Sequence, residues 1–279
     1  MRLIAAFCGL LALLVQPATA EAPPRLKPLE QQLAMIAGYN PNVGIAALDL
    51  RSGEVVSIHG DEPFPMASTV KVAIAANYLA QVEHGRRTLN DTIRGRSARQ
   101  LIDAMLINSD NYATDILLRD LGGPQTVQKW LTQQGITGLR IDRSIAQLLA
   151  DRRDLRDIRD STTPRAMVDL LHRIDSGKLL RPQSRSYLLD VMSRCKTGRN
   201  RMKALLPAGT PVEHKTGTLA GYTSDVGFIT LPHGRRLAVA LFARSSPNRP
   251  RTLAQAARAI YDGFTAALRA PFTAAFASP

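Results

Sequence analysis

The sequence predicts an α/β protein of the α+β type, in which an antiparallel five-stranded sheet flanked by terminal helices is combined with an all-helical part. Two observations carry this prediction. Strand-like patterns occur near both ends of the chain, and helical periodicity fills almost all of the chain between them. Successive strands joined by short turns pair antiparallel, so the two end regions have to meet in space to complete one sheet.

Residues 1–20 have the pattern of a secretory signal peptide. Arg2 precedes an apolar run over 3–15, and the segment ends in Ala18-Thr19-Ala20, whose small residues fit the cleavage rule. The run is too short to span a membrane, and no later stretch is long and apolar enough to anchor the protein. Cys8 lies inside the run and not at the cleavage point, which argues against a lipid anchor. We therefore expect an exported protein, periplasmic or secreted, with no membrane anchor.

Residues 21–62 and 207–279 are expected to form one discontinuous α/β domain. Each segment combines strand patterns, separated by short turns, with one helical pattern at the outer end of the domain. The helical patterns cover 26–37 and 252–268, and the strand patterns cover 43–50, 54–58, 212–216, 222–230 and 236–243.

Residues 63–206 are expected to form the all-helical domain, with the active site at its interface with the α/β domain. Three of its helical patterns begin at prolines, which are favoured in the first turn of a helix. The helical patterns cover 70–82, 98–107, 112–119, 124–134, 164–174 and 182–192.

Ser68 is the candidate nucleophile, because it precedes a helical pattern and is followed by Lys71. If the helix begins at about residue 69, the two side chains lie on one face and the lysine amine reaches the serine hydroxyl. A serine hydroxyl is a poor nucleophile without a neighbouring proton acceptor, and acyl-transfer enzymes use Ser-x-x-Lys for this purpose. Apolar neighbours such as Val72 and Ile74 disfavour the charged form of the lysine. Taken alone, the pattern also fits a helix-capping serine and a surface lysine.

Two further motifs follow in the chain, Ser109-Asp110-Asn111 after a predicted helix and Lys215-Thr216-Gly217-Thr218 on a predicted strand. Each of them alone is more often a helix cap or an ordinary strand edge. Together, in this order and with an all-helical segment between the first and the last motif, they are highly specific.

With these motifs the sequence resembles the class A β-lactamases and the wider group of penicillin-recognising active-site serine enzymes. The resemblance covers nearly all of the chain after residue 20 and implies a β-lactamase/transpeptidase-like fold. Its further motifs are Leu121-Gly122-Gly123-Pro124, Asp142-Arg143, Asp160-Ser161-Thr162-Thr163-Pro164 and Leu206-Pro207-Ala208-Gly209.

The resemblance implies the roles of the catalytic residues. Ser68 would attack the β-lactam carbonyl, with the backbone N–H groups of Ser68 and Thr218 forming the oxyanion hole. Lys71 would take the serine proton, and Ser109 would pass a proton to the leaving ring nitrogen.

The resemblance also implies the residues that bind substrate. Asn111 would hold the acylamide side chain, and Lys215 with Thr216 would bind the substrate carboxylate. Gly217 would let the strand approach the substrate. Arg201 matches the position from which some members supply an arginine to this carboxylate, although a plain surface residue is an equal alternative.

The loop after Asp142-Arg143 departs from the family. The glutamate that activates the deacylating water in class A enzymes is replaced by Ile145, and the asparagine that helps to hold this water is replaced by Leu149. Counting back from Asp160 instead places Gln147 and Asp151 at these positions. Asp151 is therefore the candidate deacylation base, although it also fits a solvated charge. Arg143 and Asp160 are expected to form the ion pair that closes this loop.

Three hypotheses for the function follow. The first is an exported class A-type serine β-lactamase that opens the β-lactam ring through a Ser68 acyl-enzyme. The second is a slowly deacylating penicillin-binding protein or D-Ala-D-Ala peptidase that acts on peptidoglycan peptides, whose chemistry does not need the missing glutamate. The third is a non-catalytic binding module for β-lactams or peptidoglycan. The intact Ser68, Lys71, Ser109 and Lys215 favour chemistry over binding alone.

Composition narrows the partners. The net charge of +13 comes from basic residues, mostly Arg, that are spread along the chain, with no basic run of five or more and few interleaved aromatic residues, so we expect no nucleic-acid partner. After cleavage Cys195 is the one remaining cysteine, which leaves no intramolecular disulfide. The five histidines have no ligand spacing, and we expect no metal and no cofactor. The expected partner is a small-molecule β-lactam or a peptidoglycan peptide, bound by a monomer.

Overall fold

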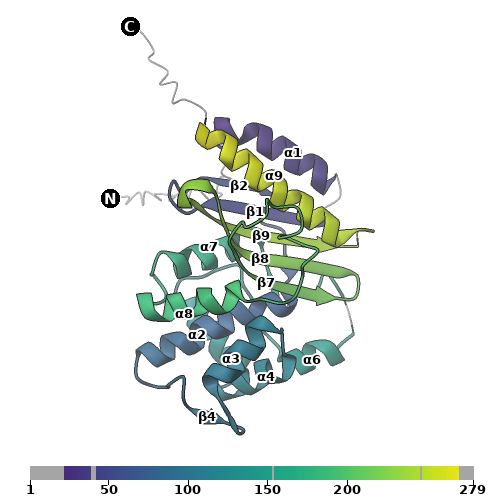
Figure 1. The fold of residues 1–279 in the computed structure, drawn as a ribbon. Coiled ribbons are helices and arrows are strands. Elements are labelled where there is room, and N and C mark those ends of the chain that lie inside the picture. Colours follow the sequence, from purple (N-terminus) through teal and green to yellow (C-terminus); the bar gives the residue numbers. More distant parts are fainter. Residues whose placement is uncertain (1–21, 39–41, 153, 246, 270–279) are drawn as a thin grey trace, which may run out of the picture.

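The computed structural model describes residues 22–38, 42–152, 154–245 and 247–269, and the predicted signal peptide lies outside them. The predicted fold class is confirmed, because five antiparallel strands form one sheet in the order β2-β1-β9-β8-β7 (Figure 1). These strands are β1 (Val43–Asp49), β2 (Val55–Ile58), β7 (Val212–Leu219), β8 (Tyr222–Thr230) and β9 (Arg236–Arg244).

Strand β9 joins the two ends of the chain, since it pairs with β1 on one side and with β8 on the other. Its side chains alternate between two separate cores on the two faces of the sheet, and all residues from 237 to 243 are buried. A strand that is covered on both faces has a continuous apolar run instead of an alternating one. This burial explains the uninterrupted apolar sequence of β9, in which Leu237, Val239, Leu241 and Ala243 face one core and Ala238, Ala240 and Phe242 face the other.

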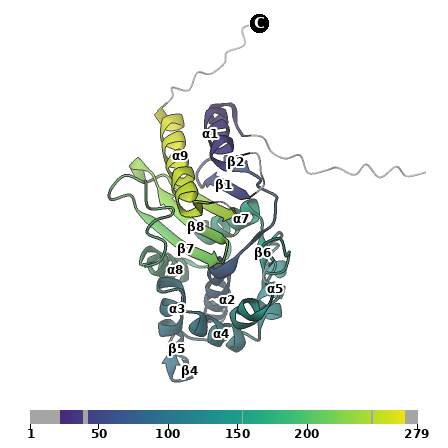
Figure 2. The same cartoon turned by 90° about the vertical axis from the view of Figure 1, so that its right-hand side faces the viewer.

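The outer face of the sheet is covered by the two terminal helices, α1 (Lys27–Ala37) and α9 (Arg249–Arg269), which lie side by side (Figures 1 and 2). Their close approach depends on Gly263, where a Cβ atom would lie 2.9 Å from Leu29 Cδ1. Apolar side chains of both helices pack on the sheet and complete the outer core: Leu29, Leu33, Leu253, Ile260 and Phe264.

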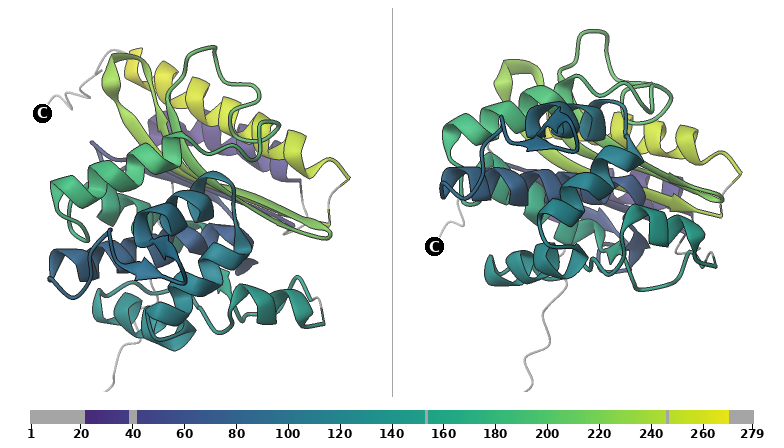
Figure 3. Two further views of the ribbon diagram at one scale, coloured as in Figure 1. Left: turned by 60° about the horizontal axis from the view of Figure 1, so that its bottom comes forward. Right: turned by 90° about the horizontal axis from the view of Figure 1, so that it is seen from below.

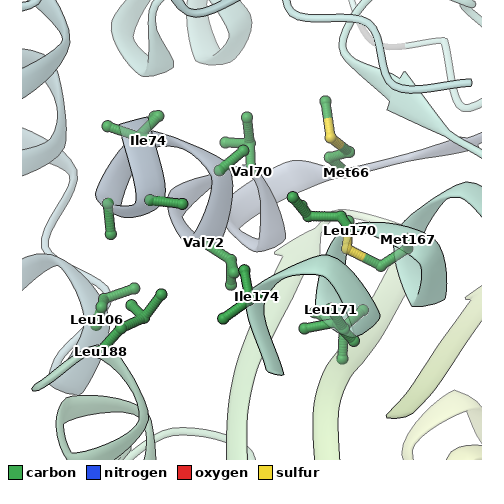
Figure 4. Packing of buried hydrophobic residues seen from close by; sticks show 14 of the residues in the cluster. Met66, Val70, Val72, Ile74, Leu106, Met167, Leu170, Leu171, Ile174 and Leu188 are labelled. Atoms are coloured by element: carbon green, nitrogen blue, oxygen red, sulfur yellow. The ribbon is translucent and has the colours of Figure 1, made fainter. Parts of the chain in front are cut away.

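The inner face is covered by α7 (Pro164–Asp175), which packs on β1, β8 and β9, and by α8 (Pro182–Ser193), which packs on β7. Figure 4 shows apolar side chains of α7 facing Met66, Val70 and Val72 across the inner core. The predicted prolines at 124, 164 and 182 all stand in the first turns of helices.

Helix α2 (Lys71–Glu83) is the central helix of the part that lies beneath the sheet. Every residue from 71 to 80 is buried, as expected for a helix that is surrounded by other helices. Figure 3 shows the molecule with this helical part turned toward the viewer. The helices packed on α2 include α3 (Ala98–Ile107), α4 (Asn111–Asp120) and α5 (Pro124–Gln133), together with α8.

Several short elements were not predicted, because they are too short to show a period. The most important is α6 (Ile145–Ala150), which begins at a capping box of Ser144 with Gln147 and is also capped by Asp115, whose carboxylate accepts from Ile145 N over 2.7 Å. The others are two-stranded pairs and single 3₁₀ turns: β3 (Phe64–Pro65) with β6 (Ser161–Thr162), β4 (Thr92–Ile93) with β5 (Arg96–Ser97), η1 (Pro24–Leu26), η2 (Ala67–Val70) and η3 (Pro232–Gly234).

Strand β7 continues to Leu219 and so includes the whole Lys-Thr-Gly-Thr motif, where the prediction ended the strand at residue 216. The domain boundaries at 62/63 and 206/207 stay a prediction. None of the helices in the described ranges is long and apolar enough to cross a membrane.

Candidate active site

Ser68 lies in the 3₁₀ turn η2, directly before α2, and is half-buried. The α-helix begins at Lys71, whereas the sequence predicted a start at about residue 69. Ala67 has a φ of 49°, a left-handed conformation that is unfavourable for a residue with a side chain. The turn is held by Met66, whose N–H donates to Asp160 O over 2.8 Å and whose carbonyl accepts from Thr69 Oγ1 over 2.7 Å. These bonds present the Ser68 hydroxyl at the start of the central helix.

Lys71 is completely buried, and its amine is held by the Ser109–Asn111 segment. Nζ donates to Asn111 Oδ1 over 2.7 Å, to Ser109 O over 2.8 Å and to Ser109 Oγ over 3.3 Å. Among the described residues no hydrogen bond joins this amine to Ser68, so the proton transfer between them expected from the sequence stays a prediction. Burial, together with the nearby charge of Lys215, lowers the pKa of Lys71 to about 7. A substantial fraction of the amine is therefore neutral near pH 7 and able to accept a proton.

Ser109 stands between the two lysines of the motifs. Its φ of 59° makes a left-handed turn between α3 and α4, and Asp110 caps α4 by accepting from Ala113 N over 2.9 Å. The turn directs the Ser109 hydroxyl to both Lys71 and Lys215, and Lys215 Nζ donates to it over 2.9 Å. Lys71 and Lys215, which lie in distant segments of the chain, therefore both contact the Ser109 hydroxyl.

Lys215 and Thr216 lie on β7 and are buried. Besides Ser109, Lys215 Nζ donates to Thr216 O over 2.7 Å. Burial lowers the pKa of Lys215 to about 8, because desolvation outweighs the favourable charge of Asp225. The Thr216 hydroxyl lies 2.5 Å from Thr197 Oγ1, in the loop after α8. Lys215 thus supplies a buried cation beside the Ser109 hydroxyl.

Gly217 allows β7 to pack against the serine turn. A Cβ atom at this position would lie 2.8 Å from the carbonyl oxygen of Met66 and 2.4 Å from Ser224 Oγ. From the sequence, Gly217 was expected to let the strand approach the substrate. In the structure its steric role is the approach of the strand to the turn that holds Ser68.

Arg201 lies along β7 and is not a free surface side chain. Its Nη1 donates to Gly217 O over 2.9 Å and to Ser224 O over 3.0 Å, and its Nη2 donates to Thr218 Oγ1 over 2.7 Å. Thr218 itself is exposed. The guanidinium group therefore stands at the same strand as Lys215, where it adds positive charge beside the motif.

The predicted ion pair between Arg143 and Asp160 is confirmed. Arg143 Nε lies 2.6 Å from Asp160 Oδ2, and Asp160 Oδ1 accepts from the backbone N–H groups of Asp142 and Arg143 over 2.8 and 3.0 Å. Asp160 also has a left-handed φ of 54°. Its carboxylate closes the loop that carries α6, and its carbonyl oxygen holds the serine turn.

Asp151 is placed in the ion-pair network of the loop. Its Oδ2 lies 2.6 Å from Arg143 Nη1 and 3.6 Å from Arg159 Nη1, and its side chain is 45% exposed. Gln147, the other residue found by counting back from Asp160, accepts from Ser144 N in the capping box of α6. No recorded hydrogen bond or ion pair within the described residues joins either side chain to Ser68 or Lys71. The role of Asp151 as the deacylation base stays a prediction.

A buried cluster at strands β7 and β8 that consists of Cys195, His214 and Asp225 was not predicted from the sequence. His214 was interpreted as an ordinary strand residue, and its place on β7 agrees with that interpretation. Nothing in the sequence indicates that the loop after α8 brings Cys195 against it, because this contact is made only in the folded chain.

A sheet of this topology, with Lys-Thr-Gly on an edge strand that faces Ser-x-x-Lys and Ser-Asp-Asn, is the arrangement of the penicillin-recognising serine enzymes. Residues 28–264 match the sequence family Beta-lactamase2, described as "Beta-lactamase enzyme family". The chain belongs to this family, within class A.

Relatives and solved structures agree with this assignment. The chain is 31% identical over 276 residues to the extended-spectrum β-lactamase PER-1 of Pseudomonas aeruginosa, with 87% of this chain and 88% of the relative covered. It is 29% identical over 231 residues to the carbapenem-hydrolysing β-lactamase KPC of Klebsiella oxytoca, with 76% of this chain and 78% of the relative covered. Its fold is similar to that of an ancestral class A β-lactamase, with a TM-score of 0.80, 32% identity, and 85% of this chain and 100% of that chain covered.

Proposed function

We propose that the protein is an exported serine β-lactamase that opens the β-lactam ring through an acyl-enzyme on Ser68. The observation that carries this proposal is the convergence of Lys71 and Lys215 on the hydroxyl of Ser109, beside the turn that presents Ser68. The pattern of residues 1–20 supports export to the periplasm or the medium.

Acylation begins with removal of the Ser68 proton. The neutral amine of Lys71 accepts it, because burial has brought the pKa of this lysine close to ambient pH. The serine oxygen attacks the β-lactam carbonyl, and the backbone N–H groups of Ser68 and Thr218 stabilise the developing oxyanion. Ser109, which accepts a hydrogen bond from Lys71, passes a proton to the departing ring nitrogen.

Substrate is held on both sides of the reacting bond. Lys215 and Thr216 bind the carboxylate, and Arg201 adds a second positive charge at the same strand. Asn111 binds the acylamide side chain. In the free protein its Oδ1 accepts from Lys71, so this amide also positions the base.

Deacylation decides between this function and its alternative. Ile145 and Leu149 replace the usual glutamate and asparagine, and Asp151 is bound to Arg143. These observations favour a slowly deacylating penicillin-binding protein or D-Ala-D-Ala peptidase as the second candidate. The β-lactamases among the relatives favour hydrolysis. For hydrolysis Asp151 is the candidate base, and it would first have to be released from Arg143.

The experiment is the intact mass of the mature protein over time after mixing with a penicillin, with Ser68→Ala as the matched control. An adduct that forms and clears while penicillin is consumed is the result expected for a β-lactamase. An adduct that persists identifies the penicillin-binding alternative. No adduct in either protein, together with no consumption of the penicillin, overturns the acyl-enzyme proposal and leaves a non-catalytic binding module.

A further inference from the structure

Cys195, His214 and Asp225 form a cluster of buried ionisable groups that the proposed mechanism does not use. His214 and Asp225 are completely inaccessible, and Cys195 is 9% exposed. The cysteine is a free thiol in the loop after α8, and the other two residues lie on the neighbouring strands β7 and β8.

Asp225 fixes the orientation of the histidine ring. Its Oδ1 lies 2.8 Å from His214 Nδ1, and its Oδ2 accepts from Met202 N over 3.2 Å. Because a carboxylate is an acceptor, Nδ1 is the donor in this pair and Nε2 is left to act as a base. Nε2 is buried and has no hydrogen-bond partner among the described residues. His214 and Thr216 lie two residues apart on β7 and so on one face of the strand, and Cys195 reaches Thr216 through Thr197.

A carboxylate, an imidazole and a thiol in this order form an arrangement that activates cysteine. Burial opposes the thiolate, but the neighbouring charge of the His214 imidazolium outweighs it and lowers the pKa of Cys195 to about 7. Burial also opposes the imidazolium, but the charge and hydrogen bond of Asp225 raise the pKa of His214 to about 9. The lowered pKa of Cys195 and the raised pKa of His214 both favour transfer of the thiol proton to Nε2.

The sulfur is also connected to the carboxylate-binding residues. Cys195 Sγ lies 3.3 Å from Thr197 Oγ1, which in turn lies 2.5 Å from Thr216 Oγ1. The next residue, Gly198, packs so closely that a Cβ atom there would lie 2.4 Å from Thr216 Cγ2. The sulfur is nearly buried beside Thr197, so we expect a group added to it to displace Thr197 and with it the Thr216 hydroxyl.

We propose that Cys195 is a reactive cysteine, and that attachment of a small group to its sulfur closes the carboxylate side of the active site. The second part rests on the proposed function, which assigns the carboxylate to Lys215 and Thr216. The reactants are small sulfenylating electrophiles, such as thiosulfonates and low-molecular-weight disulfides.

The reaction with methyl methanethiosulfonate balances as a thiol exchange. The Cys195 proton passes to His214 Nε2, and the thiolate attacks the methylthio sulfur. A new S–S bond forms, the S–S bond of the reagent breaks, and methanesulfinate leaves with the electron pair.

The first test is labelling of the native protein with methyl methanethiosulfonate, followed by intact mass and peptide mapping, with Cys195→Ser as the matched control. We expect one methylthio group on Cys195, attached at least as fast as to glutathione at the same pH, and none at this position in Cys195→Ser. A bulky aromatic disulfide should react much more slowly, because the sulfur is nearly buried. Labelling of Cys195 that occurs only in denaturant overturns the proposal.

The second test compares acylation of Ser68 by a penicillin and by its methyl ester, before and after labelling. We expect labelling to slow acylation by the penicillin at least about 10-fold, with little change for the ester, which has no carboxylate to bind. Unchanged acylation by the penicillin, or an equal loss for both compounds together with a lower melting temperature, overturns the coupling.

The failure of the proposed function is distinguishable from that of this inference. If the unlabelled protein forms no adduct with either compound, the acyl-enzyme proposal fails. The labelling rate still decides whether Cys195 is reactive, and reversal by dithiothreitol shows whether the adduct is a disulfide.

Discussion

Lys71 and Lys215 donate to the same hydroxyl, that of Ser109, over 3.3 and 2.9 Å. Two buried ammonium groups at one oxygen disfavour each other's charge, and the charge of Lys215 indeed contributes to the lowered pKa of Lys71. The negative charges of the Cys195 thiolate and the Asp225 carboxylate favour the charged form of Lys215. The site therefore separates the roles, with Lys71 as the base and Lys215 as the cation.

We expect the rate of Ser68 acylation to depend on pH with a bell shape. Both folded-state pKa values are below the ordinary value for lysine, so Lys71 loses its proton through about pH 7 and Lys215 loses its charge through about pH 8. The rate therefore rises as Lys71 loses its proton and falls as Lys215 loses its charge. Because the two lysines interact, the two apparent pKa values of the profile describe the pair and not each lysine alone. The measurement is kcat/KM for a penicillin between about pH 5 and 10. A rate that stays level across this range contradicts the prediction.

Replacing the shared hydroxyl should slow acylation strongly. Ser109→Ala removes the proton relay and one hydrogen bond to each lysine, and we expect acylation to fall by about 100-fold or more. The rate of adduct formation, followed by intact mass, gives the result. Ser193→Ala, which removes an exposed hydroxyl bonded only to Asp190 O, is the matched control and should keep the full rate. Equal rates for the two variants would exclude Ser109 from the reaction.

Asp151 is tested by the lifetime of the adduct. If Asp151 is the base, Asp151→Asn should acylate normally but clear its adduct about 100-fold more slowly. Asp154→Asn is the control, since this neighbouring carboxylate is also exposed and its recorded hydrogen bond within the described residues comes from Arg156 N. An adduct that clears at the unchanged rate in Asp151→Asn removes this residue from the mechanism.

The loop closure by Asp160 is expected to contribute to stability. Asp160→Asn weakens the contact with Arg143 and leaves this partly buried guanidinium with less negative charge, so we expect a loss of roughly 2–4 kcal/mol in the free energy of unfolding. Urea unfolding measures this loss, and faster proteolysis within residues 142–160 is expected with it. Asp154→Asn should change the free energy of unfolding by no more than about 0.5 kcal/mol. If both variants are equally stable, the ion pair does not hold the loop.

Elements with a clear local signal were predicted well from the sequence. All five strands of the sheet were found, and so were the helices that begin at Pro124, Pro164 and Pro182. Helix α6 was missed, because its six residues are too few for a period and part of its capping comes from Asp115, which lies on another helix. The boundary at Lys71 was misplaced because the strained turn at Ala67 leads into the helix through a 3₁₀ segment.

The sequence by itself determined the family, the nucleophile candidate and the loss of the usual glutamate, because these depend on residue identity and on order along the chain. The tertiary structure decided which groups meet. Lys71 bonds to Ser109 and Asn111, Asp151 bonds to Arg143, and Cys195 is linked through Thr197 to Thr216. Such contacts join segments that are far apart in the sequence. They are set by the packing of helices on a sheet, and local periodicity carries no information about them.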